Sequence, residues 1–160
     1  MVIVPSASGC WGALPSERDI AARADNDGPG YEIVIFDVAT MKVRRRIAID
    51  RIPSATWTSA DELLVRTKGE LSTIDVRTGK KTPVANEDVV NVFGDTTTGA
   101  LAHLNGPHLG VWRPASHDLV DVGPLADGDV ATNGGLLWTW GKQGLVRVDI
   151  AKLRSALPTR

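Results

Sequence analysis

Three histidines, His103, His108 and His117, fall within one short stretch of the sequence. His103 and His108 flank a turn at Asn105-Gly106-Pro107, so a hairpin there would let the two rings approach each other. Imidazole is a common zinc ligand and the side chain that titrates nearest neutral pH. A zinc site needs three or four ligands, and neither Cys10 nor a suitably spaced acid completes one. The sequence therefore predicts no metal site at these histidines.

A second oxygen-rich stretch, Asp25-Asn26-Asp27-Gly28, resembles the start of a calcium-binding loop. A calcium loop of the helix-loop-helix kind needs ligands at alternating positions and a bidentate Glu at the twelfth position, and both are missing. Asp, Asn and Gly are also the residues that a tight turn requires. We interpret this stretch as a turn.

Catalytic motifs are absent from the sequence: it has no nucleophile elbow, no phosphate-binding glycine loop and no HExxH pair. The acids Asp61, Glu62 and Glu70 occupy positions that suit turns and strand ends. The sequence thus points to no catalytic residue and no cofactor, and it favours a protein that is not an enzyme.

Five tryptophans outnumber two phenylalanines and one tyrosine. Large aromatic side chains usually fill a core, but Trp is also enriched among the residues that dominate binding interfaces. Trp138 and Trp140 would project from the same face of a strand, because side chains alternate along it. We take Trp57, Trp138 and Trp140 as candidate partner-binding residues.

Three consecutive arginines, Arg44-Arg45-Arg46, lie in a predicted outer strand. Arg44 and Arg46 would share one face, with Arg45 on the other. Charge on an edge strand is a common protection against pairing with other strands. The alternative is an acidic partner, for which Arg44 and Arg46 are the candidates.

These residues are positioned by a repeat, which is best preserved in Leu71–Thr82 (LSTIDVRTGKKT). This stretch predicts a strand, a tight turn at Arg77-Thr78-Gly79 and the start of a second strand. The matching stretches are Val34–Val43, Gly110–Leu119 and Val146–Ser155. The residues equivalent to Asp75 are Asp37, Arg113 and Asp149, which gives successive separations of 38, 38 and 36 residues. A fixed period of this size indicates a repeat architecture.

The same period holds at another position, because Leu63, Leu101 and Leu137 lie 38 and 36 residues apart. We expect one domain over residues 1–160, with approximate repeats 8–50, 54–86, 88–122 and 128–157. Each repeat would contain four short strands, the last of them at Leu153–Leu157. A short helix over Ala151–Leu157 is the alternative, and the register of the other repeats favours the strand.

Four units of about 38 residues with four strands each match the blades of a β-propeller. The predicted fold is therefore all-β, a propeller of about four four-stranded antiparallel blades, complete or part of a larger propeller. Leu71–Thr82 and Asp19–Val38 resemble the blades of TolB-like and WD-repeat-like bacterial propellers, a resemblance that covers nearly the whole chain and implies a fold but no chemistry. The sequence departs from the pattern in two ways. Met41 occupies the position equivalent to Gly79, and no Trp-Asp dipeptide closes a strand.

Closure of the propeller has three alternatives. Met1–Val4 could complete the last blade from the opposite terminus, further blades could lie outside this chain, or a second copy could pair with it. A free open arc would expose apolar faces and strand edges, which favours aggregation.

The composition is that of an ordinary globular protein, with 42% hydrophobic and 23% charged residues and a net charge of -1. It offers no excess of positive charge for nucleic acid and no apolar run that could span a membrane. Cys10 follows small residues, as in a lipoprotein, but no basic segment or long apolar stretch stands before it. We expect Cys10 to be a small buried residue in a strand. We expect a cytoplasmic protein by default, or a secreted or periplasmic one if the chain is a fragment.

The functional hypothesis is a non-enzymatic module that binds a protein or peptide on its top surface or central opening. The alternative is a propeller enzyme or a small-ligand-binding protein with its site at the axial opening. Both rest on the fold, which by itself is weak support for a function.

Overall fold

The computed structural model describes residues 10–11, 20–25, 31–50, 54–67, 70–84, 88–95, 99–106, 108–125, 128–141 and 144–157. The predicted turn at Asn26-Asp27-Gly28 and the segment Met1–Val4 lie outside these residues.

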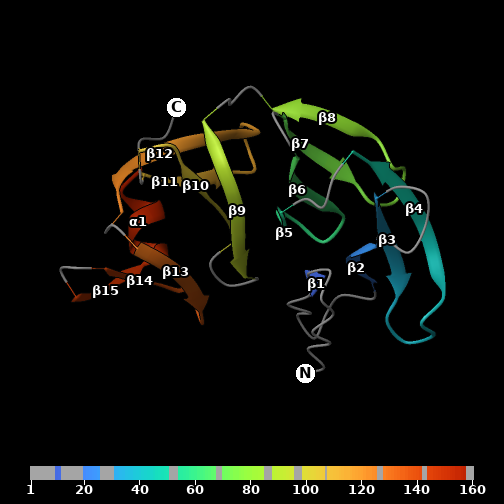
Figure 1. Ribbon diagram of the computed structural model, residues 1–160, viewed down its shortest axis with the longest axis horizontal. Coiled ribbons are helices and arrows are strands. Elements are labelled where there is room, and N and C mark those ends of the chain that lie inside the picture. The colour runs from blue at the N-terminus through green and yellow to red at the C-terminus, as the bar shows by residue number, and fades with distance from the viewer. Residues whose placement is uncertain are drawn as a thin grey trace.

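The described strands form four antiparallel sheets, one for each predicted repeat (Figure 1). The first contains β1 (Cys10–Trp11), β2 (Ile20–Asp25), β3 (Tyr31–Asp37) and β4 (Val43–Ile49). The second contains β5 (Ser54–Trp57), β6 (Glu62–Thr67), β7 (Glu70–Asp75) and β8 (Lys81–Val84). The third contains β9 (Val89–Asp95), β10 (Gly99–Leu104), β11 (His108–Arg113) and β12 (Asp118–Pro124), and the last contains β13 (Gly128–Asn133), β14 (Leu136–Gly141) and β15 (Gly144–Asp149). The predicted propeller fold of antiparallel blades is confirmed.

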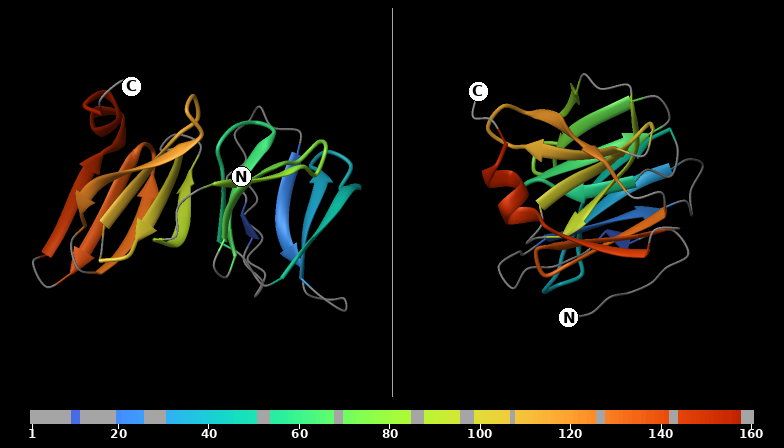
Figure 2. Two further views of the ribbon diagram at one scale, coloured as in Figure 1. Left: turned by 90° about the horizontal axis from the view of Figure 1, so that it is seen from above. Right: turned by 90° about the vertical axis from the view of Figure 1, so that its left-hand side faces the viewer.

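The sheets follow one another along an arc and do not close into a ring (Figure 1). The first strand of each sheet, β1, β5, β9 or β13, lies toward the inside of the arc, and the last strand lies toward the outside. Seen from above, the sheets stand side by side, with the first and last at opposite ends (Figure 2). Within the described part of the chain, the two end sheets therefore each have a neighbouring sheet on one side only.

The hydrophobic core lies between neighbouring sheets. In β6, Leu63 and Val65 pack in the cluster shared with the first sheet, whereas Leu64 packs in the cluster shared with the third. Both faces of this strand are buried, which explains its continuous apolar run. Burial of each such leucine contributes about 1.5–3 kcal/mol.

In the first two sheets, an aspartate holds the turn after the third strand. Asp75 Oδ1 accepts hydrogen bonds from the backbone N of Thr78 at 2.7 Å and from its Oγ1 at 2.9 Å. Asp37 makes the same two bonds with Thr40, both at 2.8 Å. This shared geometry is the physical basis of the repeated motif.

The residue four positions after Asp37, Asp75 and the equivalent Arg113 takes a positive φ in all three sheets, whatever its type. Gly79 has φ 77°, and the equivalent Met41 and His117 have φ 55° and 51°. Side chains with a Cβ adopt this conformation at a cost of about 1–2 kcal/mol. The backbone thus keeps the turn that the period predicted even where glycine is missing.

Met41→Gly is therefore expected to stabilise the protein by about 1 kcal/mol, because it removes the strain of a side chain at positive φ. Chemical unfolding of the full chain measures this, and Gly79→Ala is the matched opposite change. A Cβ on Gly79 would lie 3.2 Å from Nη1 of Arg45, so this variant should lose stability. Destabilisation by Met41→Gly would contradict the argument.

The predicted strand at Leu153–Leu157 is wrong, because the chain forms a helix, α1 (Ile150–Ser155). Asp149 Oδ1 accepts a hydrogen bond from the backbone N of Lys152 at 3.1 Å. The same contact closes the turn in the first two sheets, but here it caps the helix. Ile150 is buried, and Leu153 and Leu157 pack partly against the cluster between the third and last sheets. Their spacing of three and seven residues from Ile150 suits one face of a helix. The last sheet consequently has three strands among the described residues.

Candidate partner-binding surface

Trp138 and Trp140 lie on the face of the last sheet that has no neighbour among the described sheets. On the opposite face of β14, Leu137 and Thr139 are buried, and Leu137 belongs to the cluster shared with the third sheet. Side chains alternate along the strand, so the two tryptophans point away from that cluster. The predicted common orientation of Trp138 and Trp140 agrees with this register.

Strand pairing brings further residues to the same face. Trp138 lies between Ala131 of β13 and Arg147 of β15, and Trp140 is paired with Leu145. Trp140 is 42% exposed and Leu145 66% exposed. We call Ala131, Leu136, Trp138, Trp140, Leu145 and Arg147 the terminal face. It combines two large aromatic rings, aliphatic side chains and one cation.

Trp57, by contrast, is 7% exposed and packs in the cluster between the first and second sheets. Trp112 is fully buried between the second and third sheets. These two tryptophans fill the core, so neither side chain is exposed to a partner molecule.

Arg44 and Arg46 are engaged with carboxylates of their own sheet. Nη2 of Arg44 lies 2.6 Å from Oδ2 of Asp37, and Nη1 of Arg46 lies 2.7 Å from Oε2 of Glu32. Both arginine side chains stay about half exposed, so each pair contributes little to stability. This arrangement favours the edge-strand interpretation over an acidic partner.

The ion pair with Arg44 lowers the pKa of Asp37 to about 2, helped by the hydrogen bonds from Thr40. A carboxyl with a lowered pKa stabilises the fold above its unfolded value of 3.8, and this contribution disappears as pH falls toward 2.

We expect Arg44→Gln to raise the pKa of Asp37 toward 3.8, although the bonds from Thr40 should keep it below that value. Carbon-detected NMR titration of the side-chain carboxyls measures this pKa. Asp75 is the internal control, since Thr78 is the main cause of its lowered pKa. A change in the pKa of Asp75, or no change in the pKa of Asp37, would contradict the assignment.

The expected approach of His103 and His108 across their hairpin is wrong. Leu104 pairs with His108, and His103 pairs with Leu109, which puts the two histidines on opposite faces of the sheet. His108 instead contacts Asp121, with 2.7 Å between Nδ1 and Oδ2. In the parts of the chain that the structure describes, no three His, Cys, Asp or Glu residues group as metal ligands.

His117 lies at the boundary between the second and third sheets. Its ring meets Trp112 edge-on at 5.9 Å between centroids, and Nδ1 lies 3.9 Å from Oε2 of Glu62. The three histidines thus have separate surroundings.

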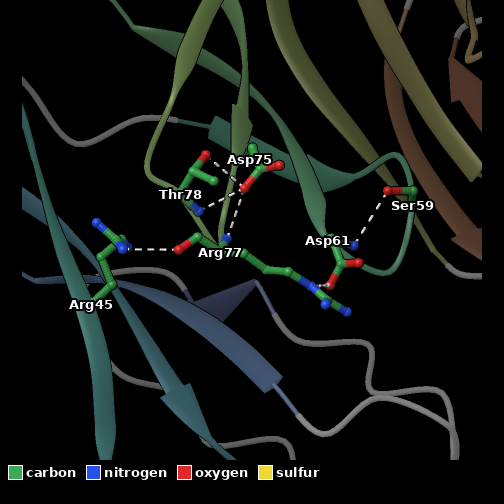
Figure 3. Close-up of polar contacts among 6 residues, drawn as sticks. All are labelled: Arg45, Ser59, Asp61, Asp75, Arg77 and Thr78. Atoms are coloured by element: carbon green, nitrogen blue, oxygen red, sulfur yellow. Dashed lines mark hydrogen bonds and ion pairs between the residues drawn. The ribbon is translucent and has the colours of Figure 1, made fainter.

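A polar network that the sequence did not reveal joins the first two sheets (Figure 3). Nε of Arg77 lies 2.8 Å from Oδ1 of Asp61, an ion pair that raises the pKa of Arg77. The backbone O of Arg77 accepts a hydrogen bond from Nη2 of Arg45 at 2.9 Å. Arg45 therefore points to the second sheet; strand alternation predicted only that it lies opposite Arg44 and Arg46. The network fixes the turn at Asp75 against the neighbouring sheet, which is a structural role.

No helix within the described ranges has the length and apolar character to cross a bilayer.

Comparison of the sequence with family models and with curated proteins gives no match.

Several solved structures share the fold. A chain in the complex of S. cerevisiae Dbp5 with Nup159, Gle1, IP6 and ADP matches with TM-score 0.55 and 9% identity, covering 84% of this chain and 41% of its own length. BamB from Moraxella catarrhalis matches with TM-score 0.55 and 14% identity, covering 87% and 45%. Hydrazine synthase from Kuenenia stuttgartiensis matches with TM-score 0.51 and 14% identity, covering 94% and 50%.

The chain thus spans half or less of the structures it resembles. At these identities the similarity shows the propeller fold alone, without distinguishing a TolB-like or WD-repeat-like type.

Proposed function

We propose that this chain is a non-enzymatic propeller module that binds a protein or peptide partner through its terminal face. The observation that carries the proposal is the exposed pair of Trp140 and Leu145 beside Trp138, on a sheet face that no other sheet of the described residues covers. Large exposed apolar groups near a polar rim are typical of interaction sites, and Trp is the residue most enriched among binding hot spots.

The surroundings of the other candidate residues make them poorer anchors for a partner, which favours the terminal face. Trp57 is part of the core, and Arg44 and Arg46 already hold carboxylates. An anchor for a partner must present apolar area that desolvates on binding. Trp140 meets this requirement, with Trp138 and Leu145 next to it.

The test selects peptides from a random displayed library on the immobilised full chain and measures each selected peptide against two variants. Trp140→Ser removes the anchor, and Val43→Ser, at an exposed apolar site on the first sheet, is the matched control. We expect Trp140→Ser to weaken binding at least tenfold, in keeping with loss of a hot-spot residue, and Val43→Ser less than twofold. Selected peptides that bind Trp140→Ser undiminished, or no selected peptide at all, would overturn the proposal.

A further inference from the structure

The outer strand of the last sheet differs from the outer strands of the other sheets in what protects it. Arg44, Arg45 and Arg46 occupy β4, and Lys81 and Pro83 occupy β8. In β12, Pro124 ends the strand and the register with β11 shifts at an irregularity. Charge, proline and irregular pairing are the usual means by which an edge strand avoids further pairing.

Strand β15 reads Gly-Leu-Val-Arg-Val-Asp and lacks proline. Leu145 is 66% and Val146 44% exposed, so aliphatic side chains are exposed on both faces of this edge. The described residues place β14 on one side of β15 and no strand on the other. The outer edge of β15 thus resembles a sheet edge that accepts a further strand.

Arg147 is the one charged side chain in the middle of β15. Each of the other arginines whose side chains are described has a carboxylate or backbone carbonyl partner: Arg44, Arg45, Arg46, Arg66, Arg77, Arg113 and Arg154. Among the same described side chains, no partner is found for Arg147. It lies beside Trp138 on the terminal face, where a cation would pair with an incoming carboxylate.

We propose that an extended segment of a partner protein adds to β15 as an antiparallel strand and completes the last sheet. The proposal rests on the proposed function and specifies its partner. Backbone hydrogen bonds to the free edge would provide affinity, and alternating side chains would provide selectivity. The favoured segment carries apolar residues opposite Leu145 and Val146 and a carboxylate opposite Arg147.

The positive charge of Arg147 favours a partner segment over two other possible occupants of this edge, a second copy of the chain and the segment Met1–Val4. A second copy pairing through its own β15 would bring another Arg147, and the one carboxylate of β15, Asp149, already caps α1. The segment Met1–Val4 contains no acidic residue. Neither therefore offers an uncommitted carboxylate to Arg147.

The probe is the synthetic peptide Thr-Val-Glu-Val-Leu-Thr with blocked ends, titrated into the full chain while backbone amides are followed by NMR. We expect saturable binding and slower hydrogen exchange of the β15 amides. Two versions with N-methyl groups on alternate residues, in opposite phase, distinguish strand pairing from other binding. Since alternate amides of a strand point to opposite sides, one phase should abolish binding and the other should leave it almost unchanged.

A charge exchange tests the role of Arg147. Glu→Lys in the peptide, or Arg147→Glu in the chain, should each weaken binding by about two- to fivefold, and the two together should restore it. Arg147 is exposed, so the variant should fold normally.

The remaining outcomes overturn the inference. If both N-methyl phases bind equally while Trp140→Ser abolishes binding, the terminal face binds a partner without strand addition, and the proposed function survives. If the peptide fails to bind and the β15 amides are already protected in the free chain, the edge is occupied by this chain itself, or by a second copy if light scattering shows a dimer.

Discussion

Replacing Trp112 with alanine is expected to lower the free energy of unfolding by about 3–5 kcal/mol. Trp112 is fully buried and lies with Leu64, Leu71 and Leu104 in the cluster between the second and third sheets. Removal of the indole ring loses its buried apolar area and leaves a cavity, which rigid strands on both sides cannot fill.

The matched control is Trp140→Ala, the same change at the exposed position on the last sheet. It should cost less than about 1 kcal/mol, because most surface substitutions have small effects. Urea unfolding followed by circular dichroism compares the midpoints, with an unchanged slope required for the comparison. Similar losses at both positions would show that the terminal face is covered in solution.

Trp112→Phe should be milder than Trp112→Ala. The ring would keep much of the core filled, and Nε1 of Trp112 has no hydrogen-bond acceptor among the described residues. Phenylalanine removes this buried donor together with its desolvation cost. A loss as large as that of alanine would point to an acceptor for the indole N–H.

The fold was predictable because its turn residues and apolar patterns lie close together in the sequence of each repeat. Asp37 and Asp75 stand 38 residues apart, and each closes a turn by bonding to the residue three positions on. Strand alternation and the apolar runs then predict sheets buried on both faces. These signals are local, so a single sequence contains them.

The end of the chain was mispredicted because the same local signal permits two structures. An aspartate that accepts the N–H three residues ahead can close a turn or cap a helix. Residues 151–154, Ala-Lys-Leu-Arg, favour helix, and the apolar residues Ile150, Leu153 and Leu157 pack against the core between the last two sheets. Packing against the last two sheets is a tertiary effect, which the repeat register does not contain.

The candidate surface was predictable only in part. Strand alternation predicted that Trp138 and Trp140 share a face, but not which tryptophans are exposed. Trp112 and Trp140 lie in comparable apolar strands, and their burial differs because the second sheet covers Trp112. The contact between Arg45 and Arg77 depends in the same way on how neighbouring sheets are placed.

The second large effect is expected at Arg154, whose guanidinium fastens α1 to the third sheet. Nη1 donates to the backbone O of Trp112 at 2.7 Å, and Nη2 donates to the backbone O of Ala100 at 3.1 Å. Gly99 leaves the space, since a Cβ there would lie 2.9 Å from Nη2. Burial lowers the pKa of Arg154, but the group stays charged at neutral pH. Arg154→Leu should therefore cost about 1.5–3 kcal/mol, the usual range for hydrogen bonds of a charged group.

Lys152→Leu is the matched control, because Lys152 stands in the same helix with its side chain 86% exposed. It should change stability by less than about 0.5 kcal/mol. Hydrogen exchange in the native state adds a local measurement: the α1 amides should lose protection in Arg154→Leu and keep it in Lys152→Leu. Arg154→Lys should recover only part of the loss, since one ammonium group does not reproduce the planar fork that reaches both carbonyls. Full recovery by lysine would mean that the charge alone, and not the two directed bonds, holds the helix in place.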